Sequence, residues 1–254
     1  TGDYVLRFNA SSAEVSNLVL KQEGGGNFYA VDIERGCPIL KGCDITSKSL
    51  ACIAIHGDAD PIIDDNKIHH SEQGSGILVY EDGKGVIKEN DIYGNAFSGI
   101  AIKEGGNPTI QNNEIHNGKQ SGIYVHDDGQ GIIENNDIYG NAFSGIEIRE
   151  GGNPTIRNNE IHNGKQNGIY VHDDGQGIIE NNDIYGNAFS GIAIREGGDP
   201  TVTGNRINGN TYEAIWIYDG GAGSFEDNDL RYNAMGDWDV SDDSTPLDLG
   251  GNFE

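Results

Sequence analysis

Several residue types that characterise other classes of protein are scarce in this chain. Among its 254 residues, proline occurs 6 times and methionine once. No apolar run reaches the roughly 18 residues of a transmembrane helix, so no membrane insertion is expected. The first residues also lack the basic, apolar and small-residue segments of a signal peptide. Because the chain begins with Thr1, we expect a mature form or an excised domain, and extracellular and cytoplasmic locations both stay open.

Basic residues are few as well, since 16 Lys and Arg stand against 41 Asp and Glu, a net charge of −25. This field repels phosphate groups, which argues against nucleic acids and anionic membranes as partners. It also weakly disfavours an anionic substrate. A cation-binding surface, a cationic partner and a well-solvated, salt-tolerant surface remain as interpretations.

Cysteine is too rare to form a disulfide framework. Cys37, Cys43 and Cys52 are odd in number and lie close together near the N-terminus. We expect buried free thiols, with a Cys37–Cys43 bridge as the alternative. Neither outcome identifies the compartment.

Repetition is the main feature of what the sequence does contain. Residues 75–120 recur as residues 121–166 and nearly again as residues 167–210, so the period is 121 − 75 = 46. Each unit divides into two related halves of 23 residues. Apolar columns follow the shorter step: Ile77, Ile100, Ile123 and Ile146, and, two residues later, Val79, Ile102, Val125 and Ile148. A spacing of two is the strand period, and the intervening Gly, Asn and Asp turns leave no room for helices.

A fixed period of this kind indicates a solenoid. The pattern of leucine-rich repeats is absent, so the sequence predicts an all-β, single-stranded, right-handed parallel β-helix of about ten coils. We expect one domain over residues 1–254, with irregular N-terminal coils or a cap over 1–50, regular coils over 51–235, and a C-terminal cap or tail over 236–254. Trp238 continues an apolar column into one last degenerate coil.

One polar column supports the same architecture. Seven asparagines stand 23 residues apart: Asn90, Asn113, Asn136, Asn159, Asn182, Asn205 and Asn228. Stacked coils place their side chains about 4.8 Å apart, which lets the amides hydrogen-bond into an Asn ladder. With one residue inserted near 69–73, the column continues through Asn66 to Cys43. We assign the row a structural role, because an unpaired buried amide costs about 1–3 kcal/mol.

The repeat blocks carry a resemblance to known proteins. Segment 153–192, NPTIRNNEIHNGKQNGIYVHDDGQGIIENNDIYGNAFSGI, resembles the β-helix repeats of a vertebrate F-box-only protein and of bacterial and archaeal proteins with repeats of the carbohydrate-binding and sugar-hydrolase type. The resemblance covers about residues 50–235. In the F-box relative it implies a recognition platform for degradation substrates, but this chain has no F-box segment and no zinc-finger cysteine spacing. Other members of this pectate-lyase-like superfamily are pectate lyases, polygalacturonases and alginate epimerases, and the fold alone does not choose among them.

Outward positions of the first strand in each coil form the candidate binding face. Tyr124, Tyr170 and Trp216 recur in every second coil, about 9.6 Å apart, which matches the repeat of an extended β-linked polysaccharide. Beside them runs the column Tyr80, Lys103, His126, Arg149, His172, Arg195 and Tyr218. The candidate ligand-binding residues are Tyr80, Tyr124, Tyr170, Trp216, Lys103 and Arg195. The alternative is that Tyr and Trp are simply good strand residues on a solvated face.

Acidic residues fill the next column: Glu81, Glu104, Asp127, Glu150, Asp173, Glu196 and Asp219. Like charges directly opposite on neighbouring strands destabilise a sheet. In one interpretation, solvation and the neighbouring Lys103, Arg149 and Arg195 relieve the repulsion. In the other, Ca²⁺ binds to Glu104, Asp127, Glu150 and Asp173, although the Gly-rich Ca²⁺ nonapeptide is absent. A second acidic column, interrupted by Arg206, contains Asp91, Glu114, Asp137, Glu160, Asp183 and Asp229.

An active site is the second hypothesis for the same face. A lyase or epimerase needs a base, an acid and a group that neutralises the uronate charge. Glu147 interrupts its column and is flanked by His126, Arg149 and His172, so these four are the catalytic candidates. Against this hypothesis, both histidines lie in identical VHDDGQG blocks, and repetition suits binding better than chemistry. The alginate-epimerase pattern DPHD is approached only loosely by residues 58–61, and no Cys/His cluster has zinc-site spacing.

The sequence thus predicts a non-enzymatic recognition module that binds a polysaccharide or a protein. The alternative is a polysaccharide lyase or C5-epimerase that acts on an acidic polysaccharide. No cofactor is expected unless Ca²⁺ binds the acidic column. Recent duplication or consensus engineering also explains the near-identical units, and the oligomeric state stays open.

Overall fold

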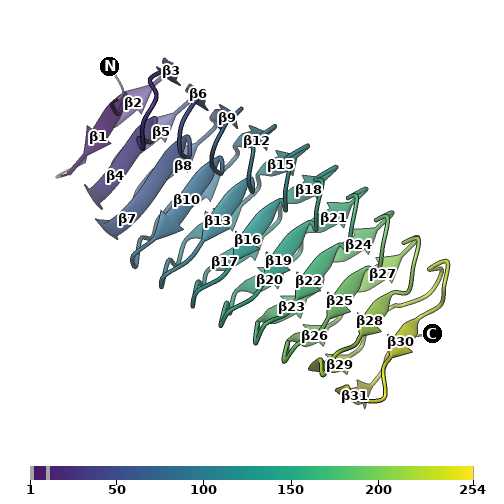
Figure 1. The fold of residues 1–254 in the computed structure, drawn as a ribbon. Helices are drawn as coiled ribbons and strands as arrows, with labels where there is room; N and C mark the ends of the chain where they lie inside the picture. Colours follow the sequence, from purple (N-terminus) through teal and green to yellow (C-terminus); the bar gives the residue numbers. More distant parts are fainter. Residues whose placement is uncertain (1–2, 10–11, 254) are drawn as a thin grey trace.

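The described part of the chain is a rod of stacked coils. A computed structural model describes residues 3–9 and 12–253, and these form strands and turns without a helix. The coils follow one another along the rod in chain order, and the two ends of the chain lie at opposite ends of it (Figure 1). The described residues therefore include no helix that is long and apolar enough to cross a membrane.

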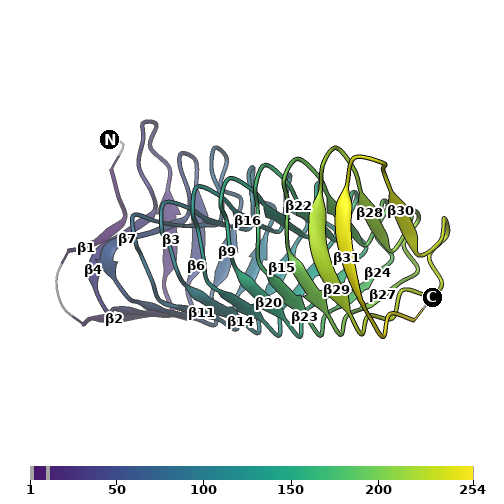
Figure 2. The same cartoon turned by 90° about the horizontal axis from the view of Figure 1, so that it is seen from below.

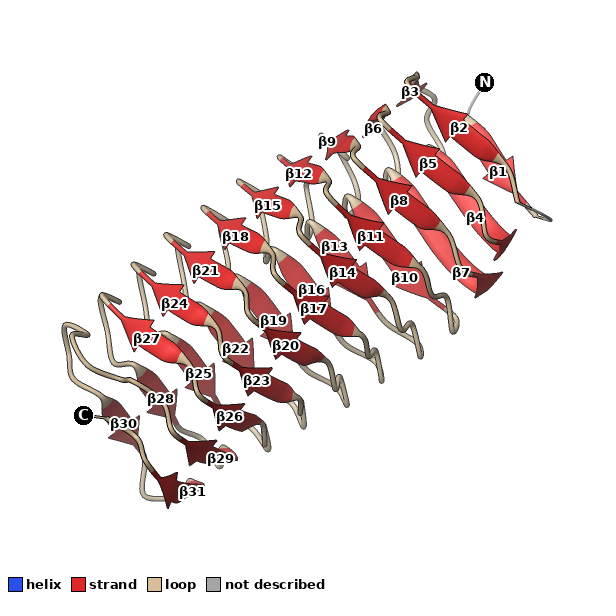
Figure 3. Ribbon diagram, turned by 180° about the vertical axis from the view of Figure 1, so that it is seen from behind, coloured by secondary structure: helices blue, strands red, loops and turns tan. Residues whose placement is uncertain are grey.

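Three parallel sheets run along the rod (Figures 2 and 3). Sheet A has 11 strands: β1 (Leu6–Phe8), β4 (Val31–Gly36), β7 (Ile53–Ala59), β10 (Ile77–Tyr80), β13 (Ile100–Ile102), β16 (Ile123–Val125), β19 (Ile146–Ile148), β22 (Ile169–Val171), β25 (Ile192–Ile194), β28 (Ile215–Ile217) and β30 (Trp238–Val240). Sheet B has 11 strands: β2 (Glu14–Ser16), β5 (Ile39–Lys41), β8 (Ile62–Asp64), β11 (Val86–Lys88), β14 (Thr109–Gln111), β17 (Ile132–Glu134), β20 (Thr155–Arg157), β23 (Ile178–Glu180), β26 (Thr201–Thr203), β29 (Ala222–Glu226) and β31 (Thr245–Gly250). Sheet C has 9 strands: β3 (Val19–Gln22), β6 (Asp44–Ser47), β9 (Lys67–His69), β12 (Asp91–Tyr93), β15 (Glu114–His116), β18 (Asp137–Tyr139), β21 (Glu160–His162), β24 (Asp183–Tyr185) and β27 (Arg206–Asn208).

Strand pairing confirms the parallel β-helix and its 23-residue step. In the regular coils each strand pairs in parallel with the strand of the next coil, as Ile77 does with Ile100 and Ile100 with Ile123. Between β7 and β10 the step is 77 − 53 = 24, because Ile53 pairs with Ile77. This register confirms the inserted residue near 69–73. Sheets A and B each contain 11 strands among the described residues, so the rod has about one coil more than expected.

Aliphatic residues fill the interior because alternate residues of each short strand point inward. On β16, Ile123 and Val125 are fully buried, whereas Tyr124 between them is partly exposed. Each fully buried aliphatic side chain contributes about 1.5–3 kcal/mol. At the corner between sheets C and A, Gly145 leaves no room for a side chain, since a Cβ there would lie 2.7 Å from the carbonyl oxygen of Gly168. Uniform coils of this kind keep the outward columns in register.

The Asn column forms the expected ladder in the turn between sheets B and C. Nδ2 of Asn113 donates to Oδ1 of Asn136 at 3.0 Å and to a backbone carbonyl of the preceding coil at 2.9 Å. Oδ1 of Asn113 accepts hydrogen bonds from the backbone and side-chain N–H groups of Asn90. At the N-terminal end, Asn66 accepts the backbone N–H of Cys43, as the column predicts. The structural role of the row is therefore confirmed.

A second ladder, which the sequence prediction did not include, runs through the turn between sheets C and A. Its members are Asn95, Gly118, Asn141, Gly164, Asn187, Asn210 and Asn233. Oδ1 of Asn141 accepts the backbone N–H of Gly118 at 3.0 Å, and its Nδ2 donates to the carbonyl of Ile115 at 3.1 Å. Glycine occupies two positions of the row, so the column of amides is interrupted in the sequence.

The two ends of the rod depart from the regular step. Leu6 pairs with Val31, a step of 31 − 6 = 25, and Val31 pairs with Ile53, a step of 53 − 31 = 22. At the other end Trp238 pairs with Ile215, which confirms the last degenerate coil. Strand β31 then pairs with β29 and completes that coil.

The three cysteines are free thiols. Cys43 and Cys52 are buried, as expected. The expectation is wrong for Cys37, which is exposed and unpaired because it lies in the turn after β4, outside the core. Burial raises the pKa of the Cys52 thiol.

Candidate functional site on the outer face of sheet A

The predicted site residues lie in three parallel outward rows along sheet A. In the first row, Tyr124 on β16 stands in register between Ala101 on β13 and Glu147 on β19. The second row lies two positions later in each coil, at the end of the strand, and includes His126. The third row, which includes Asp127, forms the corner that leads to sheet B. The structure therefore brings the predicted ligand, catalytic and metal candidates to one face.

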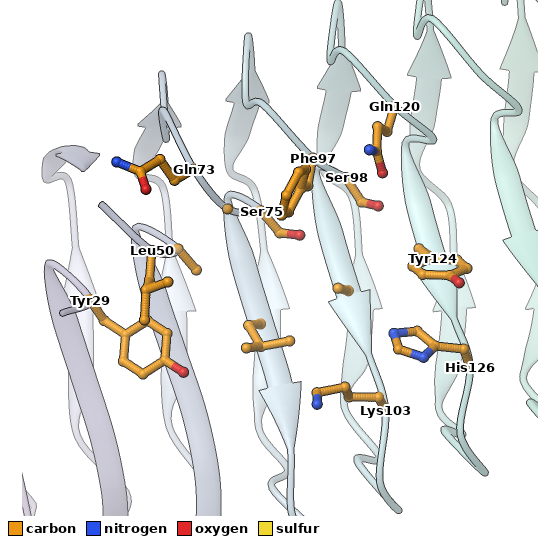
Figure 4. A pocket seen from close by; sticks show the side chains of 14 residues that line it. Tyr29, Leu50, Gln73, Ser75, Phe97, Ser98, Lys103, Gln120, Tyr124 and His126 are labelled. Carbon is orange, nitrogen blue, oxygen red and sulfur yellow. The ribbon is translucent and has the colours of Figure 1, made fainter. Parts of the chain in front are cut away.

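A groove of about 390 Å³ lies on this face over the first regular coils (Figure 4). Leu78 on β10 and Ala101 on β13 line it. Figure 4 shows Tyr29 at one end of the groove, and Tyr124 and His126 at the other. The groove is open here because Ala101 takes the position that larger side chains fill in the next coils.

Aromatic pairs cross this face in every second coil, and we call them rungs. The rungs are Tyr124–His126, Tyr170–His172 and Trp216–Tyr218, with ring centroids 4.2, 4.2 and 3.9 Å apart. Figure 4 shows Gln120 and His126 on opposite sides of the Tyr124 ring. Each Tyr of a rung therefore stacks on its own His, and an arginine of the next coil also lies over its ring. Burial raises the pKa of Tyr124 to about 12, so its phenol stays protonated at neutral pH.

Glu147 lies between two rungs and contacts one of them. Its Oε2 accepts a hydrogen bond from Oγ of Ser121 at 2.6 Å, and its Oε1 lies 3.2 Å from Nε2 of His172. Burial alone raises the pKa of Glu147, but the hydrogen bonds from His172 and Ser121 outweigh it, and the pKa is lowered. Nδ1 of His172 meets Asp173 at 3.0 Å, and the ring is 5% exposed. The carboxylate of Glu147 and the imidazole of His172 are thus hydrogen-bonded within the protein rather than open to a ligand.

His126 has the same sequence block as His172 but a different environment. Its Nδ1 lies 2.8 Å from Oδ2 of Asp127. Glu147 lies 172 − 147 = 25 residues before His172, and the residue 126 − 25 = 101 is Ala101. Within the described residues, Nε2 of His126 has no hydrogen bond or ion pair, and the side chain lines the groove. Burial lowers the pKa of His126, which favours the neutral ring.

The cationic side chains of the second row lie over tyrosine rings. Lys103 lies over Tyr80, Arg149 over Tyr124 and Arg195 over Tyr170, at 5.8, 5.4 and 5.5 Å from the ring centroids. Nζ of Lys103 also reaches Glu104 at 2.5 Å, and Nε of Arg149 lies 3.4 Å from Glu150. Each cation is therefore shared between an aromatic ring and a carboxylate.

The acidic third row adopts an uncommon backbone conformation at the corner between sheets A and B. Its φ angles are 46–49°, the left-handed region that few residues other than glycine adopt. From Glu104 to Glu196, each carboxylate contacts the basic or imidazole group of the residue before it, which relieves the repulsion along the row. The metal-ligating sets here contain one imidazole and two carboxylates, such as His126, Asp127 and Glu150. Because Ca²⁺ takes about six to eight oxygen ligands, this geometry adds no support to the Ca²⁺ hypothesis.

An exposed aromatic ridge borders the face and was not among the predicted residues. Phe97, Phe143 and Phe189 are 48%, 44% and 41% exposed and precede β13, β19 and β25. They occupy the coils between the rungs, so aromatic groups alternate from one side of the face to the other. The recurring block GNAFSG contains all three residues and was the available signal.

Solved structures of similar fold include several proteins with described activities. The periplasmic alginate epimerase AlgG has a TM-score of 0.73 and 14% identity over 95% of this chain and 74% of that chain. The A-module of the mannuronan C-5 epimerase AlgE4 from Azotobacter vinelandii has a TM-score of 0.54 and 14% identity over 94% of this chain and 89% of that chain. The enzymatically active domain of tailspike protein 2 from bacteriophage CBA120 has a TM-score of 0.61 and 11% identity over 94% of this chain and 42% of that chain. At these identities the likeness concerns the fold alone.

No curated protein matches this sequence significantly. The comparisons therefore give no support to a relationship with the F-box-only protein. A family model described as the right-handed β-helix region matches residues 5–129 and 98–252, which together span nearly the whole chain. The chain therefore belongs to this right-handed β-helix family.

Proposed function

We propose that the outer face of sheet A binds an extended polysaccharide whose chain runs parallel to the rod axis. The observation that carries this proposal is the groove of about 390 Å³ that ends at the rung Tyr124–His126. Apolar surface beside a small number of hydrogen-bonding groups is typical of ligand sites. Tyr and Trp suit such sites because they combine an apolar ring with a polar group.

The spacing of the face supports the same class of ligand. Neighbouring strands of a sheet lie about 4.8 Å apart, so two coils span about 9.6 Å, the length of a disaccharide in an extended β-linked chain. Rungs occur in every second coil, and Phe97, Phe143 and Phe189 occupy the coils between them. A chain lying between the rungs and this ridge would meet an aromatic group at each sugar.

The similar structures favour a polysaccharide that carries carboxylates, against the weak repulsion expected from the net charge of −25. Two of them are described as epimerases of alginate or mannuronan. In this chain, Lys103, Arg149 and Arg195 recur every 46 residues and offer positions for a uronate carboxylate on every second sugar. The F-box relative adds no activity to this proposal.

An array of neutral and uronate polysaccharides tests the proposal. We expect Tyr124→Ala and Tyr170→Ala each to weaken binding of the retained glycan by about tenfold or more, as truncation of a buried aromatic contact does. Tyr139→Ala on sheet C is the matched control, because it removes the same side chain from another face, and it should leave binding unchanged. The absence of any retained glycan, or an equal loss in all three variants, contradicts the proposal.

A second candidate is an epimerase or lyase, and the observation that favours it is the free Nε2 of His126 in the groove. In this reaction His126, oriented by Asp127, removes the C5 proton of a uronate, and Lys103 neutralises its carboxylate. The neutral phenol of Tyr124, stacked on His126 and so on the same side of the sugar, protonates the C4 oxygen in a lyase as the C4–O bond breaks and a C4–C5 double bond forms. In an epimerase, a water molecule on the opposite face of the sugar returns the proton to C5. Glu147 and His172 have no role here, because they are engaged with each other.

Product analysis after incubation with polyuronates tests this second candidate. Unsaturated products indicate a lyase, and a changed epimer ratio indicates an epimerase. His126→Gln should abolish either product, whereas His172→Gln, in the identical sequence block, should retain it. Binding without either product leaves the binding module as the function, and equal loss in both variants removes His126 from the role of base.

A further inference from the structure

Sheet C carries a second face with its own chemistry. Six outward rings on successive strands stack along the rod, in the order His69, Tyr93, His116, Tyr139, His162 and Tyr185, with neighbouring centroids 4.8–5.3 Å apart. Beside the rings runs the second acidic column. This face is separate from the groove and the rungs of sheet A, which the proposed function uses.

Two identical sets of metal-ligating groups occur where a histidine of this stack stands beside two acids. In one set, Asp137 on β18 and Glu160 and His162 on β21 each offer a ligand atom within 4.8 Å of the others. Nε2 of His162 already lies 2.8 Å from Oδ1 of Asp137. The same set recurs 46 residues earlier as Asp91, Glu114 and His116.

The charges around these sets favour a cation. Glu114, Asp137, Glu160 and Asp183 follow one another in register along sheet C. Within the described residues, neither Asp137 nor Glu160 forms a salt bridge with Lys or Arg. The comparable sets at the corner of sheet A differ, because each contains a glutamate that is paired with an arginine.

Space and side-chain freedom are also present at the later set. A hollow of about 240 Å³ lies against Asp137 and Glu160 and is lined otherwise by asparagines. The hydroxyl of Tyr185 reaches Glu160 only at 3.4 Å, so this carboxylate is held weakly and can turn. The hollow therefore leaves space for water ligands beside the two carboxylates, although His162 does not line it.

We propose that Asp137, Glu160 and His162 bind a divalent transition metal such as Zn²⁺, and that the earlier set binds a second ion. Zn²⁺ takes imidazole nitrogen and carboxylate oxygen at about 2.0–2.2 Å and combines three protein ligands with water. Its ligand atoms then lie roughly 3.4 Å apart, so small rotations of partly exposed side chains close the set. One imidazole with two carboxylates suits a transition metal better than Ca²⁺, which takes oxygen ligands.

A hydrogen-bonding partner for the ligating histidine is already in place. Nδ2 of Asn163 lies 2.8 Å from Nδ1 of His162, and Asn117 repeats this contact with His116. A flipped amide would accept the Nδ1–H and leave Nε2 for the metal, as outer-shell partners of ligating histidines do. The ligands come from neighbouring coils, 162 − 137 = 25 residues apart, so no local spacing motif reveals them.

The chain itself contains incomplete versions of the set. Two coils before the first set, Lys67 takes the place of the glutamate, between Asp44 and His69. Two coils after the second set, Arg206 and Asn208 take the places of Glu160 and His162. Lys and Arg therefore fit this position of the strand, and substitutions to them remove a ligand while preserving the fold.

Titration of the chelator-treated chain with Zn²⁺, followed by calorimetry and by NMR signals of the histidine rings, tests the proposal. We expect the signals of His116 and His162 to respond, with two ions bound on sheet C. Glu160→Arg should abolish the His162 response and weaken that site at least about tenfold. Glu114→Lys should do the same for His116, and Glu150→Gln on sheet A should affect neither. The melting temperature measured in chelator checks that each variant is folded.

Three results would overturn the proposal. The first is that Zn²⁺ changes the NMR signals of neither His116 nor His162. The second is unchanged Zn²⁺ affinity in the Glu114→Lys, Glu160→Arg double variant. The third is full competition by Ca²⁺ at equal concentration, because this would reduce the effect to general attraction by the acidic surface.

Discussion

Oε1 of Glu147 lies 3.2 Å from Nε2 of His172, one coil further along sheet A. In the described structure His126 has no such partner, because Ala101 stands where Glu147 would be. Two histidines in identical VHDDGQG blocks therefore differ, since one is buried in a polar cluster and the other borders the groove. One difference between successive 46-residue units thus breaks the symmetry of the repeat.

Ala101→Glu tests the importance of the free nitrogen. The new carboxylate should reach His126 as Glu147 reaches His172, and it should fill part of the groove. We expect binding of the retained glycan to fall by about tenfold, or ~1.4 kcal/mol, in a calorimetric titration. The melting temperature should change little, because Glu147 shows that the fold accepts glutamate in this row. Unchanged binding would exclude the groove as the binding site.

The lowered pKa of Glu147 makes the stability of the fold depend on pH. Glutamate in an unfolded chain titrates near pH 4.3, so near that pH the unfolded state binds more protons than the native state. The stabilisation from Glu147 is complete above this pH and is lost as the pH falls through the lower native pKa. Glu147→Gln should therefore lose less stability than the wild type between about pH 6 and pH 3. Urea unfolding at several pH values measures the difference in the free energy of unfolding between the wild type and Glu147→Gln, which should narrow in acid. Glu226→Gln, at an exposed site, is the control.

Asn136→Ala should be among the more destabilising single substitutions in the rod. Asn136 donates to the carbonyl of Ile110 and to Oδ1 of Asn159, and its Oδ1 accepts from Asn113. Each buried group left unpaired costs about 1–3 kcal/mol, so the loss should reach about 3 kcal/mol or more. Denaturant unfolding measures it. The exposed Asn107→Ala provides the comparison, and an equally small change in both variants would argue against the ladder as a source of stability.

The local pattern of the chain was sufficient to predict the fold. Inward and outward residues alternate within each strand, and the 23-residue step repeats this alternation. Ile100 and Ile123 therefore stack in adjacent coils, independently of the residues around them. An asparagine at a fixed place in each coil likewise had to meet its counterpart, and Asn90 and Asn113 do so. The same reasoning placed Tyr124 and Glu147 on one outer face.

Tertiary structure alone decided which outward groups are engaged and which are free. His126 and His172 are identical in local sequence, and residues 25 positions earlier, on the adjacent coil, determine their difference. The set of Asp137, Glu160 and His162 also forms across two coils. The sequence by itself determined the coil and the face on which each side chain stands. The contacts between neighbouring coils were decided by side-chain size and orientation. Two identical sequence blocks can therefore differ in their contacts when the adjacent coils carry different residues.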